Sequence, residues 1–212
     1  MKYIIMCGGK YDKWDTPKHL TKISGEPLVC RTIRLLRENG VTDIAISTND
    51  DRFGGLGVPL LFHYNPYHLP KDADASSPWL DAFFPTKEEV CYVFGDVLFS
   101  PKAIKTIVET ETDSIEFFAS AKPFTMNYPK HWAEPFAFKV VDTDRFFKAI
   151  KRTKELDAQG QFKRQPVSWE LWQVIKGTPL NKVDYTNYTV INDYTCDIDV
   201  PEDIEQFKGI IF

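Results

Sequence analysis

Tyr3-Ile-Ile-Met-Cys7 and the pair Gly8-Gly9 that follows decide the fold of this 212-residue chain. Five apolar residues ending at paired glycines are typical of a short strand buried on both faces, as in a parallel sheet. Glycines at the end of such a strand let the backbone approach a ligand closely, and successive N–H groups can hold phosphate oxygens. We therefore expect a phosphate-binding turn here; an ordinary tight turn is the alternative, because a lone Gly-Gly pair is a weak signal.

The next segments alternate between helix and strand patterns. Pro27 begins a predicted helix that Gly40 ends, and residues 42–48 read as the next strand. A second strand and helix follow at 89–94 and from Pro101 to about 109. Further strands are predicted at 59–63, 114–119, 134–141, 181–184 and 188–192, and further helices at 79–84, 144–156, 167–176 and up to about 208. The order predicts an α/β fold, a Rossmann-like mixed, mostly parallel sheet with helices on both faces.

Composition narrows the class of protein. The chain is 43% hydrophobic, so it has ample material for a core, and its net charge of −4 argues against a dedicated nucleic-acid binder. The four cysteines form no CxxC or Cys/His cluster, which favours buried thiols in a reducing compartment. The apolar run before Gly8 is too short for a signal-peptide core or a membrane span. We expect one cytoplasmic domain over 1–212 with no membrane or nucleic-acid partner, as a monomer or homodimer.

Charged residues gather near the predicted strand ends. Lys10, Lys13 and Lys18 place three positive charges close together, and Pro17 should hold Lys18 at a defined place. Asp96 follows Gly95 at the end of the strand at 89–94. In open α/β sheets the functional crevice lies beyond the carboxyl ends of the strands, so we group these residues there. Solvated lysines and a turn aspartate are the plain alternatives.

These segments resemble the N-terminal signature of the nucleotidyltransferase superfamily, which includes sugar-1-phosphate nucleotidyltransferases and cytidylyltransferases of phosphocholine and other small acceptors. The family pattern runs roughly LAxGxGxR, a variable loop and PKxLxxxxGxPLL. This chain has Met6-Cys-Gly-Gly-Lys-Tyr-Asp-Lys13, a short loop, Pro17-Lys18-His19-Leu20 and Gly25-Glu26-Pro27-Leu28-Val29. Tyr11 replaces the second motif glycine and Lys13 the usual arginine, so the charge is kept without the bidentate fork.

The resemblance implies a GT-A-like nucleotidyltransferase fold and a role for each matching residue. Asp96 stands at the position of the family's first metal-binding aspartate, and Asp199, in Asp197-Ile-Asp-Val-Pro-Glu-Asp-Ile204, resembles the aspartate of its C-terminal DTPEDL motif. Mg²⁺ takes oxygen ligands of this kind. For Asp199 the alternative is that its side chain caps a helix. Asp193 or Asp197 could share the metal-binding role with Asp199. The residues that would bind the triphosphate are Gly8, Gly9, Lys10 and Lys13. The catalytic residues would be Lys13, Lys18 and Asp96, and the nucleobase would be bound by Ser76 and Ser77.

The resemblance is thin over 120–190, where the acceptor would bind. We divide the chain into a nucleotide-binding part of about 1–110, an acceptor-binding part of about 111–192 and a metal-binding C-terminal motif at 193–208. An acid among tryptophans suits a cationic or hydroxylated group, and core aromatics with a hydrogen-bonded acid are the alternative. The acceptor candidates are Lys122, Trp132, Glu134, Lys139, Trp169 and Glu170.

The implied activity is Mg²⁺-dependent transfer of a nucleoside monophosphate from a nucleoside triphosphate to a small phosphorylated acceptor, a step in nucleotide-sugar biosynthesis or a similar route, with release of pyrophosphate. A glycosyltransferase of related architecture is one alternative, because Asp197-Ile-Asp199 superficially matches a DxD metal motif. A catalytically silent nucleotide-binding protein is another, because the glycine loop departs from the family pattern.

Overall fold

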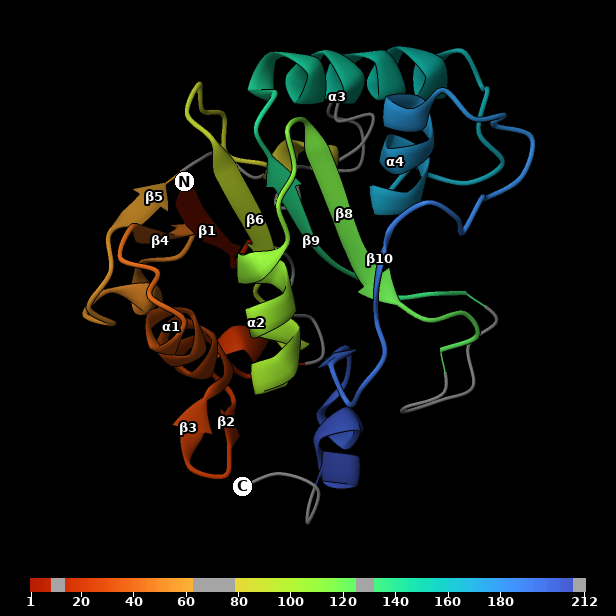
Figure 1. Cartoon of the computed structure of the whole chain (residues 1–212). Helices are drawn as coiled ribbons and strands as arrows, with labels where there is room; N and C mark the ends of the chain where they lie inside the picture. Colours follow the sequence, from red (N-terminus) through yellow and green to blue (C-terminus); the bar gives the residue numbers. More distant parts are fainter. Residues whose placement is uncertain (9–13, 63–78, 125–131, 208–212) are drawn as a thin grey trace.

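The computed structural model describes residues 1–8, 14–62, 79–124 and 132–207 (Figure 1). Its centre is a seven-stranded sheet in the order β10-β8-β9-β6-β1-β4-β5. The strands are β1 (Lys2–Met6), β4 (Ile44–Thr48), β5 (Leu60–Phe62), β6 (Val90–Phe94), β8 (Ile115–Ser120), β9 (Pro135–Val140) and β10 (Thr189–Ile191). Every pair is parallel except those of β9, which runs antiparallel to both β6 and β8. The mixed, mostly parallel sheet confirms the predicted fold class.

The register of the central strands fixes where the site lies. β1 runs between β4 and β6, and Met6 pairs with Ser47 on one side and with Phe94 on the other. Because parallel strands end at the same edge of a sheet, the residues that follow β1 and β6 emerge side by side. Gly8 and Asp96 therefore lie at the same edge, as the sequence predicted.

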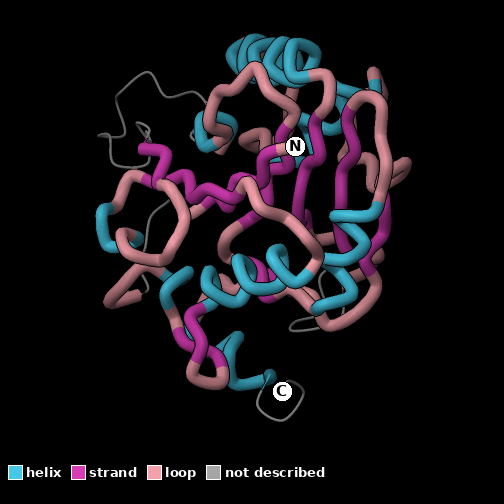
Figure 2. Tube along the Cα trace, turned by 60° about the vertical axis from the view of Figure 1, so that its left-hand side comes forward, coloured by secondary structure: helices cyan, strands magenta, loops and turns pink. Residues whose placement is uncertain are grey.

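Helices cover both faces of the sheet (Figures 1 and 2). On β9, the Lys139 ammonium reaches the carbonyl of Val108 at 3.0 Å, which belongs to α2 (Pro101–Glu109). The neighbouring Phe138 ring instead meets Phe146 of α3 (Thr143–Ala158) and Trp172 of α4 (Ser168–Lys176). Adjacent strand residues point to opposite faces. The helix α1 (Leu28–Glu38) packs beside α2, so two helices cover each face.

Two short ribbons and four 3₁₀ helices complete the described chain. Antiparallel pairs form between β2 (Lys22–Ile23) and β3 (Glu26–Pro27), and between β7 (Val97–Leu98) and β11 (Cys196–Asp197). The 3₁₀ helices are η1 (Lys18–Leu20), η2 (Asp51–Phe53), η4 (Leu80–Ala82) and η5 (Pro201–Phe207). A separate small core joins the two ends of the chain through Ile23, Leu28, Leu98, Phe124, Cys196, Ile198 and Phe207.

Three predicted elements need correction. Residues 181–184 form no strand, because the Gln173 amide of α4 donates to the carbonyls of Pro179 and Lys182 and holds that segment as a loop. The predicted helices at 79–84 and at the C-terminus are the short 3₁₀ helices η4 and η5. Both segments are short, so they can form only a few of the intrahelical hydrogen bonds that stabilise an α-helix. In the part of the chain that the structure describes, no helix is long and apolar enough to cross a membrane.

Candidate active site

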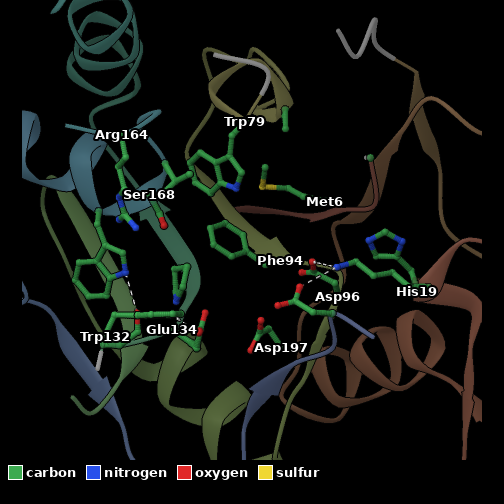
Figure 3. Close-up of a pocket in the computed structure, with 18 residues that line it drawn as sticks. Met6, His19, Trp79, Phe94, Asp96, Trp132, Glu134, Arg164, Ser168 and Asp197 are labelled. Carbon is green, nitrogen blue, oxygen red and sulfur yellow. Dashed lines mark hydrogen bonds and ion pairs between the residues drawn. The ribbon is translucent and has the colours of Figure 1, made fainter. Parts of the chain in front are cut away.

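A cavity of about 460 Å³ lies at the carboxyl edge of the sheet (Figure 3). Its walls come from the ends of β1 and β6, from η1 and the C-terminal segment after β11, and from the segment before β9 and the first turn of α4. Segments far apart in the sequence therefore meet around one space. This size is within the range of small-molecule sites, about 300–1,000 Å³.

Three charged side chains meet on one side of this cavity. The Lys18 ammonium lies 2.7 Å from Asp96 Oδ2 and 3.6 Å from Asp199 Oδ1. Asp96 is labelled in Figure 3. Lys18 begins η1, Asp96 follows β6, and Asp199 follows β11. The structure thus brings together the lysine and the two carboxylates that the sequence selected, although they span 181 positions of the chain.

The charges of the cluster support one another. Burial lowers the pKa of Lys18, but the charge of Asp96, its hydrogen bond, and the charges of Asp199 and Asp197 together raise that pKa above its usual value. Burial raises the pKa of Asp96, but the charges of Lys18 and His19 and the hydrogen bond from Lys18 outweigh it and hold that pKa below its usual value. Lys18 and Asp96 are both charged at neutral pH as a result.

Tight packing beneath the cluster fixes its geometry. A Cβ added at Gly95 would lie 2.5 Å from Met6 O, 2.7 Å from Cys7 Sγ and 3.0 Å from His19 Cδ2. The backbone N–H of Gly95 donates to Met6 O at 3.0 Å. Only glycine permits this close approach of the chain after β6 to β1, and this steric limit explains why a glycine precedes Asp96.

The C-terminal segment places Asp199 through a few directed bonds. The N–H of Ile198 donates to Asp96 O at 2.8 Å, which ties the two metal-ligand candidates together through the backbone. Asp203 Oδ2 accepts from the N–H groups of Asp199 at 2.8 Å and Val200 at 2.9 Å. Asp203 therefore supplies the side-chain acceptor of this turn, while the Asp199 carboxylate faces Lys18.

Asp193 and Asp197 differ in position. Asp193 accepts from Ser100 Oγ at 2.6 Å and from the N–H of Thr195 at 2.8 Å, so it joins the C-terminal segment to the N-terminus of α2. Asp197 lines the cavity beside Asp199. Of the two further metal-ligand candidates, only Asp197 is placed to act in the cavity.

Asp96 and Asp199 are the carboxylates of this cavity that could hold a divalent metal ion. Asp96 and Asp199 offer hard oxygen donors, and Mg²⁺ is usually held by one or two carboxylates plus phosphate oxygens and water. Within the described ranges there is no group of three or more His, Cys, Asp or Glu side chains arranged to hold a metal.

A second group of polar and aromatic side chains lies on the other side of the cavity (Figure 3). Glu134 is 7% exposed, and its Oε1 accepts from Trp132 Nε1 at 2.7 Å. The Trp169 indole N–H donates to the carbonyl of Ala133 at 2.9 Å, which ties α4 to this segment. Arg164 also lines this part of the cavity.

The structure places the remaining predicted residues outside this cluster or beyond the described chain. Lys122 lies 4.6 Å from the Tyr185 ring centroid and Lys139 bonds to carbonyls near the end of α2; neither lines the cavity. Glu170 does not line it either, because it accepts from Arg164 Nε at 2.6 Å and from the Val167 N–H at 3.1 Å. Gly8 lines the cavity, whereas Gly9, Lys10, Lys13, Ser76 and Ser77 lie outside the described residues.

The sequence reasoning missed several cavity residues, above all Arg164, Ser168 and Trp79. Arg164 stands in the basic stretch 157–166, which the sequence presents as an exposed loop. The signal that would have selected it is the i, i+6 pairing with Glu170, which becomes visible only once the start of α4 is known.

Residues 3–153 match the sequence model of the MobA-like NTP transferase domain. The chain belongs to this family. Its fold agrees with that assignment, and the chain is a nucleotidyltransferase by family. A comparison with curated protein sequences found no match.

Solved structures of low identity share the fold of this NTP transferase. A protein from Bacillus anthracis assigned as a glucose-1-phosphate thymidylyltransferase, in complex with sucrose, is 17% identical, with a TM-score of 0.59 and coverage of 99% of this chain and 94% of that one. The inositol-1-phosphate CTP transferase of T. maritima is 16% identical, with a TM-score of 0.59 and coverage of 99% and 95%. The CTP:phosphocholine cytidylyltransferase of Streptococcus pneumoniae is 16% identical, with a TM-score of 0.57 and coverage of 99% and 98%. In each of the three comparisons, nearly the full length of the solved chain aligns with this chain.

Proposed function

We propose that this NTP transferase uses Mg²⁺ to join a nucleoside monophosphate, taken from a nucleoside triphosphate, to a sugar phosphate or another small phosphorylated acceptor. The observation that carries the proposal is the Lys18 ammonium held between Asp96 and Asp199 in a cavity that also contains a separate polar and aromatic wall. One side has the charges for phosphate chemistry, and the other has room and donors for an acceptor.

The reaction is an in-line displacement at the α-phosphorus. An oxygen of the acceptor phosphate forms the new P–O bond, the bond between the α-phosphorus and the bridging oxygen breaks, and pyrophosphate leaves. Lys18 offsets the negative charge that develops around the α-phosphate, because a fixed ammonium needs no reorganisation during the reaction. Positioning and electrostatics carry the rate, since phosphoryl chemistry asks little covalent work of the protein.

Asp96 and Asp199 hold the metal in this proposal, with Asp197 as a neighbouring acid. When bound, Mg²⁺ neutralises phosphate charge and orients the nucleotide and the acceptor phosphate.

The triphosphate site is proposed at the first glycine turn. Gly8 lines the same cavity as Lys18 and Asp96. Gly9, Lys10 and Lys13 follow in sequence and would supply N–H groups and positive charge, and Ser76 and Ser77 would meet the base. These five assignments rest on the family motif.

Pyrophosphate release tests the proposal. The assay mixes Mg²⁺, the common nucleoside triphosphates and a panel of phosphorylated sugars and alcohols. We expect Asp96→Asn to lower turnover at least about 100-fold, the scale of losing a transition-state electrostatic contact. Asp113→Asn, an exposed aspartate, is the matched control and should keep wild-type turnover. Full activity of Asp96→Asn would remove the metal assignment.

The glycosyltransferase alternative has one observation in its favour, because Asp197 and Asp199 both line the cavity as a DxD pair would. The family match favours nucleotidyl transfer instead. Incubation with nucleotide-sugars separates the two: sugar transfer or hydrolysis without any use of triphosphates would replace our proposal.

A further inference from the structure

Trp14 joins the N-terminal segment of the chain to the C-terminal segment at Asp199. Its indole Nε1 donates to the carbonyl oxygen of Asp199 at 3.3 Å, across 185 positions of the chain. An indole N–H can only donate, so the carbonyl is the acceptor and the bond has one direction. Trp14 therefore contacts the backbone of the second metal-ligand candidate.

The Trp14 ring packs on the small core that joins the two ends of the chain. It is partly buried there, and this core includes Ile198, the residue directly before Asp199. Lys18, which follows Trp14 by four positions, forms an ion pair with Asp199 Oδ1 at 3.6 Å. The N-terminal segment thus holds Asp199 at two points, the backbone through Trp14 and the carboxylate through Lys18.

Hydrogen bonds hold both backbone groups of Asp199. Its N–H donates to Asp203 Oδ2 at 2.8 Å, and its carbonyl accepts from Trp14 Nε1. These two groups together set the direction of the Cα–Cβ bond, because φ and ψ are the only soft dihedrals of the backbone. Packing does less, since the Asp199 side chain is 58% exposed, against 32% for Asp96. The direction of the Asp199 carboxylate therefore depends on the bond from Trp14.

We propose that Trp14 is a positioning residue, which holds Asp199 in place for the metal and couples that placement to the triphosphate. Trp14 comes directly after residues 8–13, to which the proposed function assigns the triphosphate. A triphosphate that holds these residues also holds the Trp14 indole against the Asp199 carbonyl. Mg²⁺ demands near-ideal octahedral geometry, so a misdirected carboxylate binds it less tightly. The inference rests on the proposed function, because it concerns the assembly of that same site.

Trp14→Phe tests the inference, because phenylalanine keeps an aromatic ring on the small core and has no N–H donor. Trp172→Phe is the matched control. The Trp172 indole donates to the Thr186 carbonyl, also at 3.3 Å, and the residue does not line the cavity. Both variants lose one indole–carbonyl bond, and only the place of the bond differs. Urea unfolding checks that both variants fold.

The first readout is the coupling between triphosphate and metal. CTP, UTP, dTTP, GTP and ATP are each titrated into the full chain in a calorimeter, once in Mg²⁺ and once in EDTA. The ratio of the two Kd values measures the coupling. For the triphosphate that binds the wild type most tightly, Trp14→Phe should lower this ratio about tenfold, as expected for loss of a contact that orients a metal ligand. Trp172→Phe should keep the wild-type ratio.

A double variant shows whether Trp14 acts through Asp199. In the background of Asp199→Asn, Trp14→Phe should change the ratio no further, because the carboxylate that Trp14 directs is gone. An equal further loss in that background would mean that Trp14 acts elsewhere, and it would overturn the inference.

The second readout needs no ligand. Hydrogen exchange of the backbone N–H groups of Asp199 and Val200, followed by NMR, reports how firmly this turn is held. Trp14→Phe should speed that exchange about 2–10-fold, the equivalent of one net hydrogen bond. Trp172→Phe should leave it unchanged.

The outcomes separate this inference from the proposed function. A lower ratio and faster exchange in Trp14→Phe, but not in Trp172→Phe, support both. A wild-type ratio in Trp14→Phe overturns the inference and leaves the function standing, and so does an equal loss of coupling in Trp172→Phe. If no triphosphate binds the wild type in a Mg²⁺-dependent way, the proposed function falls and the coupling falls with it. Faster exchange in Trp14→Phe would then still show that Trp14 places Asp199.

Discussion

His19 follows the proposed catalytic lysine, and its burial makes the stability of the protein depend on pH. The ring is 1% exposed, and burial is the main cause that lowers its pKa from 6.5 to about 4. Between these values the unfolded chain binds a proton that the folded chain does not, so the free energy of unfolding falls as the pH falls. From pH 7 to pH 5 this one group should lose about 2 kcal/mol of stability.

Urea unfolding in EDTA, at about pH 7 and about pH 5, measures this effect when His19→Gln is compared with the wild type. The variant should lose about 2 kcal/mol less than the wild type over that interval, because glutamine does not titrate. Equal pH dependence of the two proteins would show that His19 is not buried in its neutral form.

A single methyl group added at Gly95 should destabilise the fold. Its added Cβ would meet Met6 O and Cys7 Sγ at 2.5 Å and 2.7 Å, and neither the β1 backbone nor a buried thiol can move freely. Gly95→Ala should destabilise the fold by about 1–3 kcal/mol, the usual cost of overpacking. Gly54→Ala is the control, because its Cβ meets only Asp51 O, at 3.1 Å. Urea midpoints compare the two, and equal values would contradict the steric argument.

At this scale the sequence identified the charged side of the cavity and part of the other side, where Trp132, Glu134 and Trp169 were among the acceptor candidates. Lys18, Asp96 and Asp199 were predictable because a family motif marks each and because strand ends converge at one sheet edge. Arg164 and Ser168 were not, because their place depends on how the loop before α4 folds. Glu170 was selected as an acceptor residue, yet its side chain caps α4 and holds Arg164.

Among the elements, the turn after β11 decides where Asp199 lies. Asp203 is 4% exposed and accepts from two backbone N–H groups there. Asp203→Ala removes that acceptor and leaves the Asp199 side chain itself unmutated. We expect the affinity for Mg²⁺ in the presence of a triphosphate to fall about tenfold, since residues that orient metal ligands have effects of this size.

Calorimetric titration of Mg²⁺ into the nucleotide complex measures this affinity. Glu202→Ala changes the exposed neighbouring residue and should leave the affinity unchanged. Unchanged affinity in Asp203→Ala would mean that Asp199 is placed by other contacts or does not hold the metal.

Elements with long apolar patterns were predictable and short paired ones were not. β1, β6 and α1 follow from local periodicity, which is a property of the segment itself. The β7–β11 ribbon joins residues almost 100 positions apart, and no local pattern signals such a pairing. The incorrect strand at 181–184 has the same origin, because the Gln173 side chain, a tertiary contact, holds those carbonyls.

For the molecule as a whole, the two ends of the chain complete one site. The N-terminal turn and η1 supply Gly8 and Lys18, and the C-terminal segment supplies Asp199. The small core that includes Ile23, Leu98 and Ile198 packs these segments together behind the charges. The division into nucleotide-binding, acceptor-binding and metal-binding parts stays a prediction, and so do the monomer or homodimer and the cytoplasmic location.

The most direct test of the central claim is thermal unfolding with CTP, UTP, dTTP, GTP and ATP, each with and without Mg²⁺, on wild type, Asp96→Asn and Asp113→Asn. A ligand at 100 times its Kd stabilises a protein by about 2.7 kcal/mol, which for this chain length raises Tm by roughly 5–10 °C. Our account predicts that shift for at least one triphosphate, only with Mg²⁺, in the wild type and Asp113→Asn but not in Asp96→Asn. An equal shift in Asp96→Asn, or no shift with any triphosphate, would contradict it.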